Sequence, residues 1–241
     1  CKEHSMPAVA ITDSNNLFGS LELSQALAGE GVQPIIGCQL DFVPMPQTGM
    51  RTHFTQPKPE PLVLLAQSEQ GYQNLLEVAS SAYLTPAEGH APLLDEAVLE
   101  GKTEGLICLT GGENGPLIQR ILRGRGEAAR EWLQQMTALF PERLYIEIQR
   151  HGTAAQAQSE PELLKLAAEL NLPIVATNDV YFATREMYQA HDALLCIADG
   201  AYVTQEERRR VTEEHYFKSA EEMAELFADL PEALENTVNI A

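Results

Sequence analysis

Short apolar runs alternate with stretches of helical periodicity along most of the chain. The apolar runs predict six strands, at residues 8–12, 34–42, 62–66, 105–110, 144–148 and 173–177. Most of these runs are continuously apolar, which is typical of strands that are covered on both faces, as in parallel sheets wrapped by helices. The pattern therefore predicts an α/β domain whose sheet either closes into a barrel or stays open and doubly wound.

Amphipathic spacing predicts helices in the segments between these strands. The expected helices cover residues 21–29, 69–83, 117–122, 127–140 and 162–170. Residues 44–61 are rich in proline and predict an irregular excursion with room for a hairpin.

The pattern changes near Ala201, where the regular alternation of strands and helices stops. Residues 204–211 are highly charged, and Ser219 then opens the S-x-x-E spacing of a capping box with Glu222. Pro231 can begin a further helix at its first turn. The last part of the chain is therefore predicted to contain a pair of helices.

Two regions follow from this change. We expect residues 1–200 to form an α/β barrel domain, and residues 201–241 to form a linker and a helical segment that leads onward. Because the chain opens on what reads as the tail of a helix, we also expect further polypeptide before Cys1 and after Ala241.

The charge of the chain argues against a nucleic-acid grip. The formal net charge is −19, from 35 acidic and 16 basic residues, whereas affinity for nucleic acid comes largely from Lys and Arg that displace counterions. The one basic cluster, residues 208–210, lies among Glu206, Glu207, Glu213 and Glu214. We expect a solvated patch in which these neighbours pair with the arginines.

Cysteine usage and hydropathy indicate a cytoplasmic protein. Cys38, Cys108 and Cys196 each lie in apolar runs, and neither they nor Cys1 show a C-x-x-C spacing, so buried reduced thiols are expected rather than disulfides or a zinc site. No apolar run approaches the ~20 residues that cross a bilayer. Nothing in the sequence suggests export, and no membrane contact is expected.

Two aspartates follow predicted strands at positions where α/β proteins place their sites. Asp13 follows the first strand, and Asp179 follows the last. Each could bind a metal or orient a ligand. From the residues alone, a turn or a helix N-cap is the favoured role, because Asp favours those positions.

The histidines do not predict a metal centre. No two of them have the spacing of zinc ligands. His151 follows a strand at a turn-like position, and His191, beside Asp192 at the start of an apolar helix over residues 193–197, reads as a structural residue. The turn at residues 111–115 could show backbone amides to an anion, although it follows none of the known phosphate-loop patterns.

Several segments together resemble one family, the PHP (polymerase and histidinol phosphatase) domain of bacterial DNA polymerase III alpha subunits. They occur in order over nearly the whole chain, and they are specific as a set rather than singly. The most recognisable are Ile11-Thr12-Asp13 with Asn16-Leu17-Phe18-Gly19, and Ala176-Thr177-Asn178-Asp179-Val180. The remaining segments lie at residues 33–37, 64–75, 190–192 and 216–237.

The resemblance implies a fold and a parent protein. The fold would be a distorted (β/α)7 PHP barrel, with its first strand upstream of Cys1 and a helical extension at the C-terminal end. The parent would be a DNA-directed DNA polymerase, a nucleotidyltransferase of DNA replication, whose catalytic carboxylates lie in later domains.

The resemblance also implies a metal site that this chain has largely lost. Members that bear metal hold several divalent ions with histidines and acids at the strand ends, because clustered dications need many strong donors. Of the matching positions only Asp179 keeps a ligand, and Asp13 could support a ligand without touching metal. The positions that depart from the pattern are Ser14, Gln39, Pro61, Gly112 and Tyr181.

Three hypotheses follow for the function. The first is a non-catalytic domain, without a cofactor, that stabilises the polymerase subunit and contacts its other domains and the proofreading exonuclease subunit. The second is a phosphoesterase or 3′→5′ exonuclease that depends on Mn, Zn or Fe. The third is an independent small-molecule phosphatase, against which the polymerase-like tail after Ala201 argues.

Overall fold

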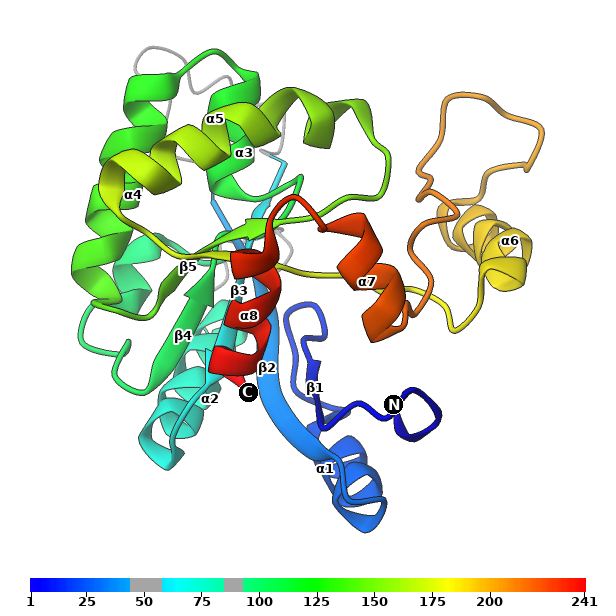
Figure 1. The fold of residues 1–241 in the computed structure, drawn as a ribbon, viewed down its shortest axis with the longest axis horizontal. Helices are drawn as coiled ribbons and strands as arrows, with labels where there is room; N and C mark the ends of the chain where they lie inside the picture. Colours follow the sequence, from blue (N-terminus) through cyan, green and yellow to red (C-terminus); the bar gives the residue numbers. More distant parts are fainter. Residues whose placement is uncertain (44–57, 85–92) are drawn as a thin grey trace.

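The computed structural model describes residues 1–43, 58–84 and 93–241. Within them, one curled sheet of six strands runs in the order β1-β2-β3-β4-β5-β6 (Figure 1). The strands are β1 (Ala8–Ile11), β2 (Gln33–Phe42), β3 (Glu60–Ala66), β4 (Leu106–Leu109), β5 (Leu144–Ile148) and β6 (Ile174–Ala176). All six predicted strands are present, and the sheet forms a partial barrel, so the predicted fold class is confirmed.

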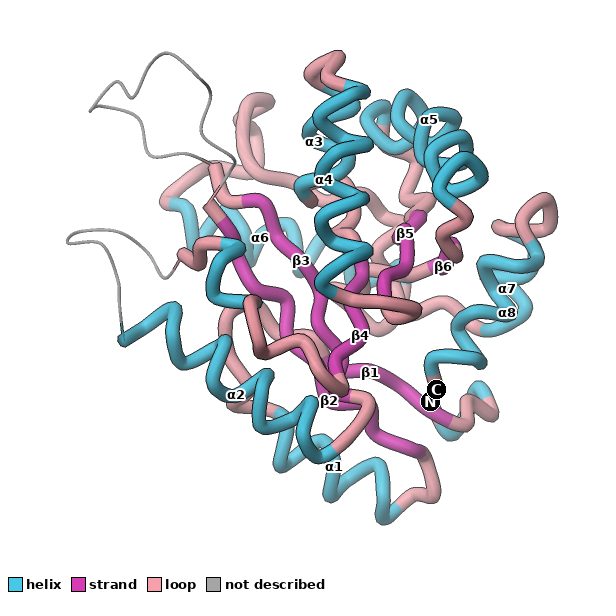
Figure 2. Tube along the Cα trace, turned by 90° about the vertical axis from the view of Figure 1, so that its left-hand side faces the viewer, coloured by secondary structure: helices cyan, strands magenta, loops and turns pink. Residues whose placement is uncertain are grey.

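Helices cover this sheet, and their bounds agree with most of the predicted ones (Figure 2). They are α1 (Ser20–Gly29), α2 (Glu69–Leu84), α3 (Pro116–Leu122), α4 (Gly126–Leu139), α5 (Ala154–Leu170), α6 (Tyr188–Asp199), α7 (Ala220–Leu226) and α8 (Pro231–Ile240), with short 3-10 helices η1 (Lys2–His4), η2 (Glu96–Leu99) and η3 (Arg185–Met187). Most of the predicted excursion at 44–61 lies outside the described residues. Residues 60 and 61 already belong to β3.

The direction of β3 differs from the all-parallel arrangement that continuous apolar runs favoured. β3 is antiparallel to both β2 and β4, whereas the pairs β1–β2, β4–β5 and β5–β6 are parallel. After β3, the chain passes through α2, bonds to the end of β2 at Leu94, and re-enters the sheet beside the point where β3 ended, with Ala66 opposite Leu106. The chain therefore runs along the sheet twice between β3 and β4, rather than once as in a β-α-β unit. As a result, β4 starts beside the end of β3 and is antiparallel to it.

Burial on both faces explains why β3 is continuously apolar. Leu62 and Leu64 belong to the main core, which α2, α4 and α5 cover, whereas Val63 and Leu65 belong to a second cluster on the other face with Val175. Side chains alternate between the faces of a strand, so both sets must be apolar when both faces are covered. The prediction of a two-sided sheet is confirmed, although the sheet is mixed.

Helix α5 begins earlier than predicted. The sequence placed its start at Glu162, after Pro161, because proline usually marks a helix boundary. In the structure Thr153 caps the helix by accepting a hydrogen bond from the Gln156 amide, and Pro161 lies within it. One lost backbone hydrogen bond is tolerated because Leu163 and Leu166 bury this helix against the core.

The C-terminal helices pack on the body. The capping box at Ser219 and Glu222 is present as predicted, and Pro231 occupies the first turn of α8. Phe227 and Ala233 are fully buried in the main core, and the Asn236 amide donates a hydrogen bond to the Ile174 carbonyl of β6. The division of the chain near residue 200 stays a prediction.

Two further expectations have a direct structural outcome. Cys38, Cys108 and Cys196 are buried free thiols, as predicted. Among the described residues, no helix is long and apolar enough to span a membrane.

Candidate functional site at the strand ends

The carboxyl ends of β4, β5 and β6 meet at one edge of the sheet, and a buried glutamate of β5 joins them. Glu147 is 3% exposed. One of its carboxylate oxygens accepts hydrogen bonds from the amides of Gly111 and Gly112, which follow β4, at 2.9 and 3.0 Å. Successive amides of this kind form an anion-binding nest. The anion that fills it here is the chain's own carboxylate.

The other carboxylate oxygen of Glu147 is bonded as well. It accepts hydrogen bonds from the Thr177 hydroxyl, just after β6, and from the Gln149 side-chain amide at 3.0 Å. Gln149 also donates to the Thr177 hydroxyl oxygen at 3.2 Å. Four donors therefore hold one buried carboxylate, and this strand-end network (Gly111, Gly112, Glu147, Gln149 and Thr177) ties three strands together.

Glycine is required in the turn that supplies the two amides. Gly111 has φ +86°, and a Cβ there would lie 1.8 Å from the Pro61 carbonyl oxygen. Gly112 has φ +48°, and a Cβ there would lie 2.5 Å from the Gln149 side-chain oxygen. The Gln149 side chain therefore fills the space that a side chain at position 112 would occupy.

Asp179 lies beside this network, directly after β6. Its side chain is half-buried. Burial raises the pKa of the carboxyl to about 6, and the negative charge of Glu147 adds to the rise, while a hydrogen bond with the Tyr181 hydroxyl works against it. The same environment raises the pKa of Tyr181 to about 12. The ionised form of this carboxyl is therefore destabilised, as is that of a metal ligand when no cation is near.

Asp13 lies just after β1 and beside the middle of β2, in a different setting. Its side chain is exposed, and its backbone carbonyl accepts a hydrogen bond from the Gln39 amide at 3.1 Å. The Gln39 side chain in turn donates to the Ser14 hydroxyl at 3.3 Å. Within the described part of the chain, no hydrogen bond or ion pair joins Asp13 to Asp179. The structure thus places both predicted residues at strand ends and does not bring their side chains into contact.

A pair of stacked histidines lies beside Asn178, the residue before Asp179, and sequence reasoning missed it. The rings of His151 and His215 stack with centroids 3.9 Å apart. Gln156 donates to His151 Nδ1 at 3.1 Å, so Nε2 carries the proton and donates to the Asn178 side-chain oxygen at 3.3 Å. Burial, with the neighbouring His215, lowers the pKa of His151 to about 3. His151 lies at a bend after β5, at the turn-like position predicted from the sequence, and it is a neutral, buried residue whose two ring nitrogens are both bonded.

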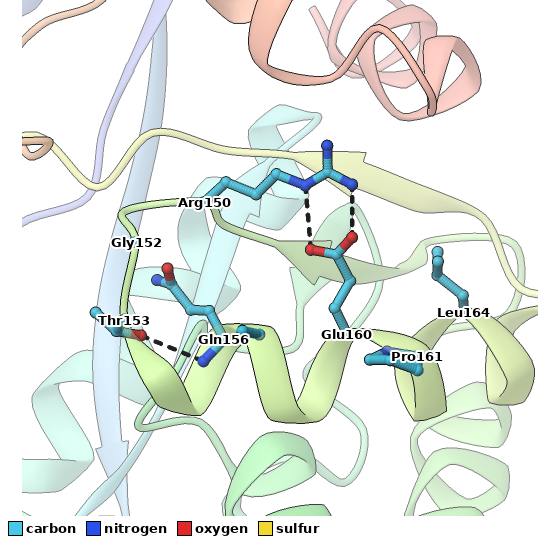
Figure 3. A pocket seen from close by; sticks show the side chains of 8 residues that line it. Arg150, Gly152, Thr153, Gln156, Glu160, Pro161 and Leu164 are labelled. Atoms are coloured by element: carbon cyan, nitrogen blue, oxygen red, sulfur yellow. Dashed lines mark hydrogen bonds and ion pairs between the residues drawn. The ribbon is translucent and has the colours of Figure 1, made fainter.

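A hollow of about 470 Å³ lies along α5, next to these histidines (Figure 3). At its rim Arg150 binds both carboxylate oxygens of Glu160, contacts Asp229 and the Leu226 carbonyl, and stacks on Phe227. The guanidinium is saturated by these partners, so it clamps the α7–α8 turn to α5 and offers little to a ligand. The lining residues are Arg150, Gly152, Thr153, Gln156, Ala157, Glu160, Pro161 and Leu164.

The residues at the strand ends do not fit a cluster of divalent metals. Across residues 1–43, 58–84 and 93–241, no three His, Cys, Asp or Glu side chains are grouped as ligands. Glu147 uses its lone pairs on four internal donors, and Gln39 and Ser14 bond to each other. Asp179 keeps a carboxylate near this edge, although it already bonds to the Tyr181 hydroxyl, whereas clustered dications need several free donors.

Glu147 carried a weak signal in the sequence. It is a charged residue inside the apolar run of residues 144–148, and a buried charge demands partners. The partners themselves, at positions 111, 112 and 177, could not be found from local patterns. The same holds for His151 and His215, which lie 64 positions apart.

Comparison with known proteins gives a consistent family. Residues 1–151 match the PHP domain. The chain is 50% identical over 239 residues to the DNA polymerase III subunit alpha of Caulobacter vibrioides, 38% identical over 237 residues to that of Rickettsia bellii, and 35% identical over 237 residues to that of Pseudomonas aeruginosa. These alignments cover 98–99% of this chain and 19–21% of the relatives, so the chain spans about a fifth of their length.

A solved structure described as a metal-dependent phosphoesterase, from Bifidobacterium adolescentis, aligns with 74% of this chain and 78% of its own, at 12% identity and a TM-score of 0.39. That likeness is too distant to bear on the site. The family match over 151 residues and the run of alpha-subunit relatives lead to one conclusion: this chain belongs to the PHP domain family.

Proposed function

We propose that this chain is the PHP domain of the alpha subunit of a bacterial replicative DNA polymerase, and that the domain itself is non-catalytic. It would stabilise the subunit and offer a docking surface. The relatives over nearly the whole chain support the first part of the proposal. The strand-end network around Glu147 supports the second, and it is the observation on which the proposal depends.

The physical reason to expect a non-catalytic domain is that few side chains at the strand ends are free to bind metal. A hydrolytic site of this family type would need several unengaged ligands to hold metal ions close together. At this edge Glu147 is bonded to four donors and Gly112 has no side chain. Asp179 remains as a remnant ligand position, and Asp13 as a supporting one. A remnant carboxylate such as Asp179 would not by itself balance the mutual repulsion of clustered dications.

The partners follow from the same assignment. We expect the domain to contact other domains of its own subunit and the proofreading exonuclease subunit, in the cytoplasm. A formal charge of −19 disfavours a direct grip on DNA. We further propose that residues 1–200 form the barrel proper and that residues 201–241 lead toward the polymerase domains, which would carry the nucleotidyl-transfer chemistry.

Metal analysis of the full-length subunit tests the non-catalytic part. We expect less than stoichiometric Mn, Zn or Fe after exposure to each metal, and no hydrolysis of single-stranded DNA or of a simple phosphoester by the domain. Stoichiometric metal, together with hydrolysis that Asp179→Ala abolishes, would replace this proposal with the phosphoesterase or 3′→5′ exonuclease hypothesis.

Gel filtration tests the docking part. The subunit and the purified exonuclease subunit, mixed at tens of micromolar, should elute as one complex. An unrelated domain of similar size and negative charge serves as the control for non-specific association. Separate elution of the two subunits would remove the exonuclease from the list of partners while leaving the metal result unaffected.

A further inference from the structure

Helix α6 contains a run of five apolar residues, and the structure buries only part of it. Residues 193–197 form this run, and five consecutive residues span more than one turn of a helix, so a run of this length places apolar side chains around the whole helix. Of its residues, Cys196 alone is buried. Leu194 and Ile197, three positions apart on one face, are 60% and 78% exposed, and Tyr202 and Val203 just beyond the helix are 73% and 55% exposed.

The segment that carries this surface stands away from the sheet. Figure 1 shows α6 and the loop after it to one side of the body, reached by two connecting stretches. These stretches pair with each other, because Phe182 bridges to Tyr216 and the Tyr181 amide donates to the His215 carbonyl at 2.9 Å. The segment 181–217 is therefore an arm, fixed at its base, that projects α6 from the domain.

Ion pairs that the sequence did not predict join α6 to the loop that follows it. Arg208 binds both carboxylate oxygens of Asp192 at 2.5 and 2.6 Å, with its own side chain 5% exposed, and Arg209 binds Asp199. The expectation that these arginines pair with the neighbouring glutamates is wrong, because α6 brings two aspartates closer. Bidentate pairs of this kind are among the strongest. The loop after α6 is thus pre-organised, and its apolar side chains are presented rather than disordered.

A pre-organised apolar surface in water indicates a partner. A second copy of the chain is a poor candidate, because two bodies of charge −19 repel each other. The relatives are about five times as long as the matched region, which leaves ample polypeptide to cover the arm. A partner in the same polypeptide is also present at high effective concentration, so even a small interface stays closed.

We propose that the arm surface, defined as Leu194, Ile197, Tyr202 and Val203, is covered by another part of the same subunit, outside these 241 residues. The contact is permanent and apolar, with the arm serving as an internal brace between the PHP domain and the rest of the polypeptide. This inference rests on the proposed function, since it requires that the chain be part of a longer subunit.

Site-directed photocrosslinking in the full-length subunit tests the proposal. The photoreactive amino acid p-benzoylphenylalanine is placed at position 197, and in a separate variant at position 134 as a matched control. Gln134 is exposed on α4, a helix whose apolar side is already buried. After irradiation, the cross-linked peptides are identified by mass spectrometry.

We expect position 197 to cross-link within the same polypeptide to a peptide outside the 241 residues, and position 134 to give background only. A cross-link between two copies, a cross-link to another protein, or no cross-link above the control would each overturn the proposal.

A stability measurement tests the same proposal with substitutions by a natural amino acid. Ile197→Asp should lower the unfolding temperature of the full-length subunit, whereas Gln134→Asp should leave it unchanged, because a surface substitution without a partner has little effect. Equal unfolding temperatures for the two variants would also overturn the proposal. Neither experiment measures metal or hydrolysis, so failure here is distinct from failure of the proposed non-catalytic role.

Discussion

The substitution Glu147→Met separates a structural carboxylate from a functional one. If Glu147 holds the strand ends together, replacing it with an apolar side chain of similar length must destabilise the fold. If instead it is a ligand kept for a metal, the fold without metal should gain stability from its removal, because functional groups are often held at the expense of stability. The two hypotheses predict opposite signs for the change in the free energy of unfolding.

The magnitude follows from the bonds that the substitution breaks. The amides of Gly111 and Gly112 are buried, and both lose their acceptor. A buried donor left without a partner costs about 1–3 kcal/mol. Gln149 and Thr177 can still bond to each other, and removal of a buried charge recovers part of the loss. We therefore expect the free energy of unfolding to fall by about 2–4 kcal/mol.

The assay is urea unfolding at pH 7, followed by the fluorescence of Trp132, the single tryptophan, which is fully buried. Glu131→Met is the matched control. Glu131 is exposed on α4, so its replacement should change the free energy of unfolding by no more than about 0.5 kcal/mol. A Glu147→Met chain as stable as the control, or more stable, would refute the reasoning.

Three other predictions use the same assay. Asp179→Asn should raise the free energy of unfolding at pH 7 by about 1–3 kcal/mol, since burial raises the pKa of this carboxyl from 3.8 to about 6 and the ionised form is penalised; a loss of stability would show that the charge is needed. Stability should also depend on pH with two opposing slopes between pH 6 and 4. His151, with its pKa lowered to about 3, loses stabilisation as the pH falls below the unfolded value of 6.5, by up to about 1.4 kcal/mol per unit, whereas Asp179 gains it. The Asp179→Asn chain should therefore lose stability more steeply than the original chain over this range, and parallel curves would contradict the assignment. Gly111→Ala should destabilise by about 3 kcal/mol or more, because a Cβ would lie 1.8 Å from the Pro61 carbonyl oxygen at a positive φ, while Gly29→Ala, with nothing within 4 Å, should be neutral or slightly stabilising; similar effects at both glycines would be inconsistent with the close approach.

The sequence by itself determined the features that depend on neighbouring residues. The apolar runs located all six strands, because a strand covered on both faces needs apolar side chains at every position. The capping box at Ser219 is formed by residues three positions apart, and it is present as predicted. Segments of similar spacing along the chain identified the family, which the comparison confirms.

The tertiary structure alone decided which distant groups meet. The antiparallel pairing of β3 with β4 depends on how many times the segment between these two strands runs along the sheet. The partners of Glu147 come from three strands, and the partners of Arg208 and Arg209 come from α6 rather than from the adjacent glutamates. Local sequence sets the energy of turns and helices, whereas a buried carboxylate or an ion pair gains its stability from whichever groups the fold brings within about 3 Å. No pattern within a short segment contains that information.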